Sequence, residues 1–227
     1  MWSSSSTGNR KSCLNQWEGK WSVTDAWQVF RKTLSDLWNE LYLLAIVNVL
    51  WVALNLLLVT GPPATAGLFV LTRRLARGKD AGLRDFFEGF RRYFWQSWLW
   101  GIVAGAGFFI LGGDVVLTGG LSNADYVIFI QGFFLMLLFL WAFLLLYAFP
   151  LILEQEQPGL RLALRNALVM FANNRSFSVV LFGLALLVAL LSSLLFAPWG
   201  VITVVFLALL GNHAVLNRLA AHRAAQD

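Results

Sequence analysis

The sequence predicts an all-α integral membrane protein: a bundle of about six transmembrane helices, the second of them short, with amphipathic interfacial helices on the cytoplasmic side. Three observations predict this fold. Of the 227 residues, 59% are hydrophobic and 13% are charged, against roughly 45–50% and 25% in a soluble domain. The apolar residues gather in uncharged runs, several of them long enough to cross about 30 Å of hydrocarbon as helices. The runs also lack the strict alternation of apolar and polar residues that membrane strands need.

We expect the spans in chain order at about residues 41–60, 62–77, 96–113, 126–153, 177–196 and 199–217. They form one domain over 24–220, between a disordered tail over 1–23 and a short tail over 221–227. The second span is short, because its uninterrupted apolar part ends at Thr72 and measures roughly 16 Å as a helix. Either Arg73, Arg74 and Arg77 snorkel to the inner headgroups, or the Gly61 break lies below the outer surface. If this segment does not cross, the N-terminus moves outside.

The basic residues predict the orientation of the chain. All 17 fall within four segments, 10–32, 73–92, 161–175 and 218–223, and the connections between the other span ends contain none. Under the positive-inside rule these segments lie in the cytoplasm, as do both termini. Since membrane topology already accounts for the net charge of +5, we expect the lipid bilayer as a partner and no nucleic acid.

Two cytoplasmic segments are predicted to be amphipathic helices. In LRDFFEGFRRYFW, an apolar stripe that includes Leu83, Phe86, Phe87 and Phe90 lies opposite charged residues spaced at i, i+4. The segment LRLALRNALVMF, which begins at Leu160, repeats this pattern. We expect the first helix to be interfacial, with its aromatic side chains facing lipid or the bundle and its charged side chains facing water.

The candidate site lies where the first and second spans meet. Asn48 and Asn55 are seven residues apart and therefore share one face of the first span. The sequence GPPATAG over 61–67 breaks the helix and restarts it, with the hydroxyls of Thr60 and Thr65 nearby. The restarted helix can present N–H groups to a polar solute, as in several transporters. The same residues also suit a tight hairpin with interhelical hydrogen bonds, and the sequence leaves both interpretations open.

Enzymatic chemistry has no support in the sequence. Cys13 is the only cysteine, and no Ser-His-Asp spacing, H-E-x-x-H, P-loop or dinucleotide fingerprint is present. We expect no metal, no cofactor and no catalytic residue. Glu154 is predicted to lie at a solvated helix end, and Asn212 and His213 near the inner end of the sixth span, with the histidine at the interface.

The stretches NVLWVALN, GPPATAGLFVLTRRL and DFFEGFRRYFWQS together resemble the YesL-like family of bacterial integral membrane proteins, a domain-of-unknown-function family. The resemblance implies a bacterial plasma membrane protein and, by gene neighbourhood, an accessory of carbohydrate ABC importers. No ligand residues are established for the family. The leading hypothesis is therefore a non-enzymatic accessory that docks through its two amphipathic cytoplasmic helices. The alternative is a stand-alone small-solute transporter with its site at residues 61–67.

Overall fold

The computed structural model describes residues 23–57, 59–121, 125–156, 159–173, 175–194 and 198–224. Within these ranges the chain forms nine α-helices and no strand. The helices are α2 (Val23–Asn39), α3 (Leu41–Leu56), α4 (Gly61–Ala76), α5 (Leu83–Arg92), α6 (Phe94–Leu121), α7 (Asp125–Glu154), α8 (Leu160–Asn173), α9 (Arg175–Leu194) and α10 (Pro198–Ala224). The predicted disordered tail over 1–23 lies outside the described residues, apart from Val23.

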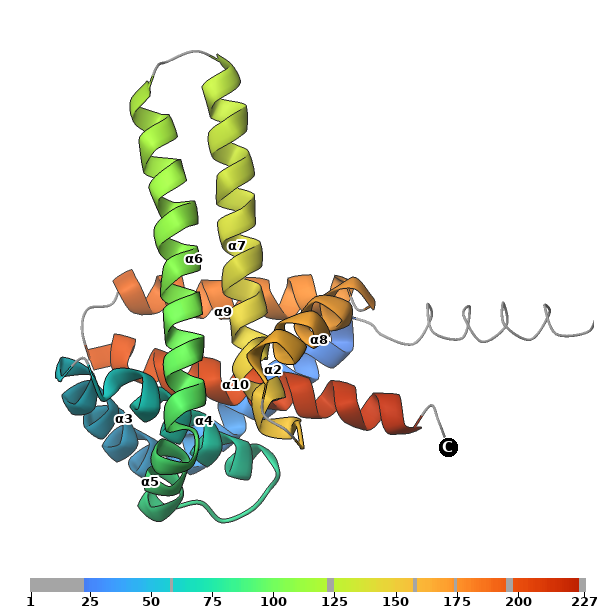
Figure 1. The fold of residues 1–227 in the computed structure, drawn as a ribbon. Helices are drawn as coiled ribbons and strands as arrows, with labels where there is room; N and C mark the ends of the chain where they lie inside the picture. Colours follow the sequence, from blue (N-terminus) through green and yellow to red (C-terminus); the bar gives the residue numbers. More distant parts are fainter. Residues whose placement is uncertain are drawn as a thin grey trace, which may run out of the picture.

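The molecule has two parts (Figure 1). Helices α6 and α7 lie side by side as a long antiparallel hairpin, here called the α6–α7 hairpin. The other helices gather around its base and form the body. Within the body, α9 and α10 run across the hairpin rather than alongside it (Figure 1).

Three helices are individually long and apolar enough to cross a membrane: Phe94–Thr118, Val127–Glu154 and Thr203–Ala221. Two further pairs pass this test only when taken together, α2 with α3 and α8 with α9, and they bend by 87° and 110°. Helix α4 has 16 residues and is not among them. The all-helical fold with several apolar helices is confirmed and indicates a membrane protein. A bundle of six spans is not confirmed, because the crosswise course of α9 and α10 differs from parallel packing.

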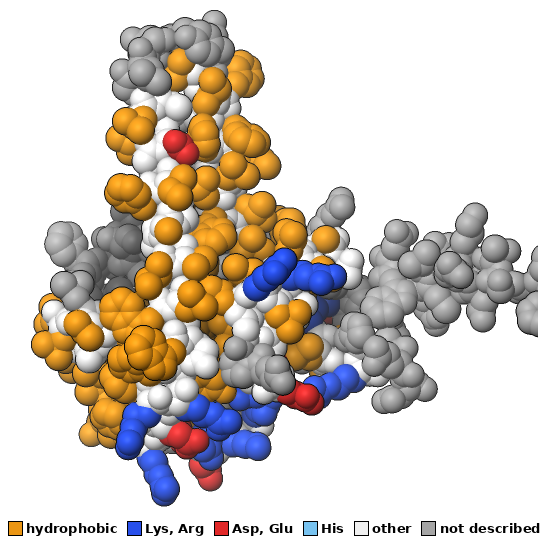
Figure 2. Space-filling view, viewed as in Figure 1, with side chains coloured by type: hydrophobic (Ala, Val, Ile, Leu, Met, Phe, Trp, Pro, Cys, Tyr) orange, Lys and Arg blue, Asp and Glu red, His pale blue; other side chains and the backbone are white. Residues whose placement is uncertain are grey.

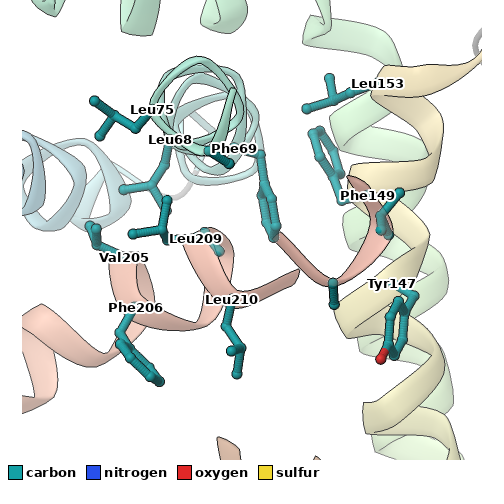
Figure 3. Packing of buried hydrophobic residues seen from close by; sticks show 14 of the residues in the cluster. Leu68, Phe69, Leu75, Tyr147, Phe149, Leu153, Val205, Phe206, Leu209 and Leu210 are labelled. Carbon is teal, nitrogen blue, oxygen red and sulfur yellow. The ribbon is translucent and has the colours of Figure 1, made fainter. Parts of the chain in front are cut away.

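The core lies where α4, α7 and α10 meet. Figure 3 shows apolar side chains from these three helices converging. The ring of Phe69 on α4 stacks on Phe149 of α7 with 4.9 Å between ring centres. Leu209 and Leu210 of α10 are fully buried in the same cluster. Helix α10 is therefore central to the body.

A proline and a glycine shape the contact between α7 and α10. Pro150 lies inside α7, and because it has no N–H, the carbonyl of Leu146 loses its helical donor. Gly211 of α10 packs against this carbonyl, where a Cβ would lie 2.7 Å from the oxygen. A side chain at position 211 would therefore separate the two helices.

Candidate functional site

The two asparagines predicted to form the site bond within their own helix. Asn48 is buried, and its Nδ2 donates to the carbonyl of Leu44 at 3.0 Å. Asn55 Nδ2 donates to the carbonyl of Trp51 at 2.8 Å. The two side chains lie on the same face of α3, about 10 Å apart along the helix axis.

The two predicted threonines bond to the chain around the helix break. Thr65 Oγ1 donates to the carbonyl of Gly61 at 3.1 Å and accepts the indole N–H of Trp51, also at 3.1 Å. Thr60 Oγ1 donates to the carbonyl of Leu54. These bonds hold α3 against the start of α4. They agree with the interpretation of residues 61–67 as a tight hairpin with interhelical hydrogen bonds.

The restarted helix offers few donors at its N-terminus. Thr60 is the N-cap, and the helix begins with Gly61, Pro62 and Pro63. The two prolines have no N–H, and the N–H of Ala64 donates to the carbonyl of Thr60 at 2.9 Å. The start of α4 is therefore poorly equipped to bind an anion, although the sequence placed a candidate site there.

The opposite end of α4 carries a clearer site. Between the last turns of α4 and the inner face of α5 lies an open pocket of about 290 Å³, here called the basic pocket. Five cationic side chains line it against two anionic ones, and a tyrosine, a valine and a glycine complete the wall: Arg73, Arg74, Arg77, Lys79, Arg92, Asp85, Glu88, Tyr93, Val70 and Gly89.

Helix α5 forms one wall of this pocket because its backbone packs closely on α4. A Cβ on Gly67 would lie 2.5 Å from the carbonyl oxygen of Phe86, and one on Gly89 would lie 3.0 Å from the Cα of Gly67. Phe86 is fully buried in this contact. Of the two surroundings expected for the aromatic face, lipid or the bundle, Phe86 has the bundle. Phe87 and Leu83 do remain exposed.

Asp85 fixes the start of α5. Its carboxylate pairs with Arg74 of α4 and accepts the backbone N–H of Gly82 at 2.9 Å. The second bond satisfies a backbone donor just before the helix and places a negative charge in its first turn, where the helix dipole favours it. One carboxylate thus caps α5 and ties it to α4.

Glu154 joins the end of α7 to the same region. Its carboxylate accepts Arg73 Nε at 2.7 Å, and Arg77 Nη2 lies 2.7 Å from both oxygens. The sequence predicted a solvated helix end for Glu154, whereas its side chain is only 11% exposed and is paired with both arginines. The residues are about 80 positions apart in the sequence, so no local pattern could reveal the contact.

One family of proteins matches the segment that contains this region. A family model described as "Protein of unknown function, DUF624" matches residues 44–115. No curated protein and no solved structure matches the chain. The match is consistent with the resemblance to the YesL-like family, and its description assigns no activity. It covers the helix break and the whole lining of the basic pocket, but not Glu154.

Polar residues outside the matched segment connect α10 to the rest of the body. Asn212 Nδ2 donates to the carbonyl of Phe69 at 3.1 Å and lies 3.0 Å from Thr72 Oγ1, both on α4. His213 is buried, with Nε2 2.9 Å from Asp36 Oδ2 on α2. The histidine, which the sequence places near the interface, forms an interhelical contact. A polar pair inside an apolar span is the sequence signal for such a role.

Proposed function

We propose that this protein is a non-enzymatic membrane component that docks a partner at its basic end, as an accessory of a carbohydrate ABC importer. The observation that carries the proposal is that α5 packs on α4 through one face and leaves the other face exposed. Its inner face is locked to α4 through Phe86 and Gly89. Its outer face presents a shallow groove lined by Arg84, Phe87, Glu88, Arg91 and Arg92. A pre-formed helix with exposed aromatic and arginine side chains has the composition of a binding surface, at low ordering cost.

We propose helix α8 as a second docking element. It exposes Arg161 and Arg165 together with apolar side chains that include Leu162 and Leu168. Both helices carry a share of the positive charge that the positive-inside rule assigns to the cytoplasm. We therefore propose a bacterial plasma membrane protein with its basic end and both termini in the cytoplasm. The six-span topology stays a prediction.

Site-specific photo-crosslinking tests the docking role. A crosslinking amino acid at Phe87, co-expressed with the permease and ATPase subunits of a carbohydrate importer from the same genome, should form a covalent adduct with one of them. The same amino acid at Phe129, exposed on α7, should not. Phe129 lies close to the start of α7, at the end of the hairpin away from α5. No adduct from Phe87 in the assembled importer would refute the accessory role.

The transporter alternative is tested by two substitutions at the helix break. Thr65→Val removes the acceptor of the Trp51 indole, and Asn55→Leu removes the bond to the Trp51 carbonyl. We expect Thr65→Val, which loses an interhelical bond, to lower the unfolding free energy by about 0.6–2 kcal/mol, and Asn55→Leu, whose bond lies within α3, to lower it by less. We also expect no sugar flux in vesicles reconstituted with the wild type. Wild-type flux that these variants abolish without loss of stability would establish the transporter instead.

A further inference from the structure

The basic pocket carries more positive charge than its own carboxylates neutralise. Glu154 is shared by Arg73 and Arg77, so one carboxylate serves two guanidinium groups. Arg74 pairs with Asp85. Within the described residues, Lys79 and Arg92 have no carboxylate within ion-pair distance.

We propose that this pocket binds a phosphate group, supplied by the headgroup of an anionic phospholipid or by a soluble phosphate. Arginine guanidinium groups suit phosphate oxygens because they offer several donors in a planar fork, and lysine adds a point charge. Arg73 and Arg77 are also pre-positioned by Glu154, which reduces the ordering cost of binding. The inference does not rest on the docking role.

The surroundings of the pocket favour the lipid as the source of the phosphate. Figure 2 shows apolar side chains covering the hairpin and the flank of the body, and Lys and Arg gathered at the lower end, where Figure 1 places α5. Tyr93 lines the pocket, and Trp95, two residues later, is 77% exposed. Tryptophan is enriched at headgroup depth in membrane proteins, and basic pockets on the cytoplasmic side bind anionic headgroups. The pocket is therefore placed where lipid phosphates lie.

Native mass spectrometry of the protein released from nanodiscs tests the inference. The nanodiscs contain equal amounts of phosphatidylglycerol and phosphatidylcholine, and the readout is the ratio of the two lipids retained. The wild type should retain phosphatidylglycerol preferentially. The double variant Lys79→Gln, Arg92→Gln should lower that ratio, on the order of fivefold for each cation removed. Both side chains are exposed, so the fold should persist.

A matched control distinguishes binding in the pocket from a general effect of the protein's positive charge. The double variant Arg161→Gln, Arg165→Gln removes the same charge from exposed positions on α8, and it should leave the lipid ratio unchanged. An equal loss in both double variants would mean general attraction to anionic lipid and would overturn the pocket. Glu88→Gln removes a carboxylate from the pocket and should raise the ratio, a gain that misfolding cannot produce.

Competition distinguishes the two sources. Inorganic phosphate is added to the nanodiscs before release, against sodium chloride of equal ionic strength. Retention of phosphatidylglycerol in both salts assigns the pocket to a lipid headgroup. Selective displacement by phosphate, together with thermal stabilisation of the detergent-solubilised protein that Lys79→Gln, Arg92→Gln abolishes, assigns it to a soluble phosphate. Neither preferential lipid retention nor stabilisation by phosphate would refute the inference.

Discussion

The α6–α7 hairpin and helix α10 qualify as membrane spans by the same measure of length and apolarity, yet their surroundings differ. In the apolar stretches of α6 and α7, 6% and 11% of residues are buried within the protein, whereas in α10 the share is 61%. The hairpin therefore leaves its apolar surface to lipid or to another protein. Helix α10 has the rest of the body around it.

The apolar stretch of α10 also contains more buried polar side chains than that of either hairpin helix. Helix α10 buries Thr203, Asn212 and His213 within its apolar stretch. In the hairpin, Gln131 Nε2 of α7 donates to the carbonyl of Val115 on α6, at 3.3 Å and partly buried. Polar side chains in an apolar span need partners, so a helix with several of them indicates tight packing against other helices.

The largest difference in stability between the body and the α6–α7 hairpin is expected when one methyl group is added to a glycine in each. Gly67→Ala, in the body, places a Cβ 2.5 Å from the carbonyl oxygen of Phe86, and should cost about 1–3 kcal/mol because α4 and α5 must separate. Gly105→Ala, on α6, meets no atom within 4 Å and should change stability by less than about 0.5 kcal/mol. Thermal unfolding of both variants in the same detergent measures the difference. Equal destabilisation would show that the hairpin is packed as tightly as the body.

A smaller contrast is expected from removing one amide in each part. Asn212→Leu loses the bonds to Phe69 and Thr72 and should cost about 1–2 kcal/mol. Gln131→Leu loses one long, partly buried bond and should cost less than about 1 kcal/mol. Chemical unfolding in mixed micelles ranks the two. If Gln131→Leu proved the more harmful, the hairpin would contain a packed contact that its exposure does not reveal.

The helix bounds were largely predictable because uncharged runs and breaks mark them directly. The predicted spans 126–153 and 62–77 lie close to α7 (Asp125–Glu154) and α4 (Gly61–Ala76). The third was placed at 96–113, whereas α6 continues to Leu121. The crosswise course of α9 and α10 was not predictable, because hydropathy gives the length of a helix and not its direction.

The candidate site was only partly predictable. Sequence reasoning found the helix break and the amphipathic α5, both of which are local patterns. It missed the role of Glu154, since the contact with Arg73 and Arg77 exists only once α7 lies against α4. It left open whether Phe86 faces lipid or the bundle, because a periodic stripe cannot tell a lipid-facing aromatic from one packed on a neighbouring glycine such as Gly67.

The length of the hairpin has a consequence for the membrane around it. Its two apolar stretches, of 25 and 28 residues, measure about 38 and 42 Å as helices, whereas a typical hydrocarbon core is about 30 Å thick. Such hydrophobic mismatch is relieved by helix tilt or by local thickening of the bilayer. Since Glu154 ties the base of α7 to α4, a hairpin that tilts in a thin bilayer carries the body with it. The resting orientation of the whole molecule should thus depend on bilayer thickness, with thicker membranes holding the hairpin more upright.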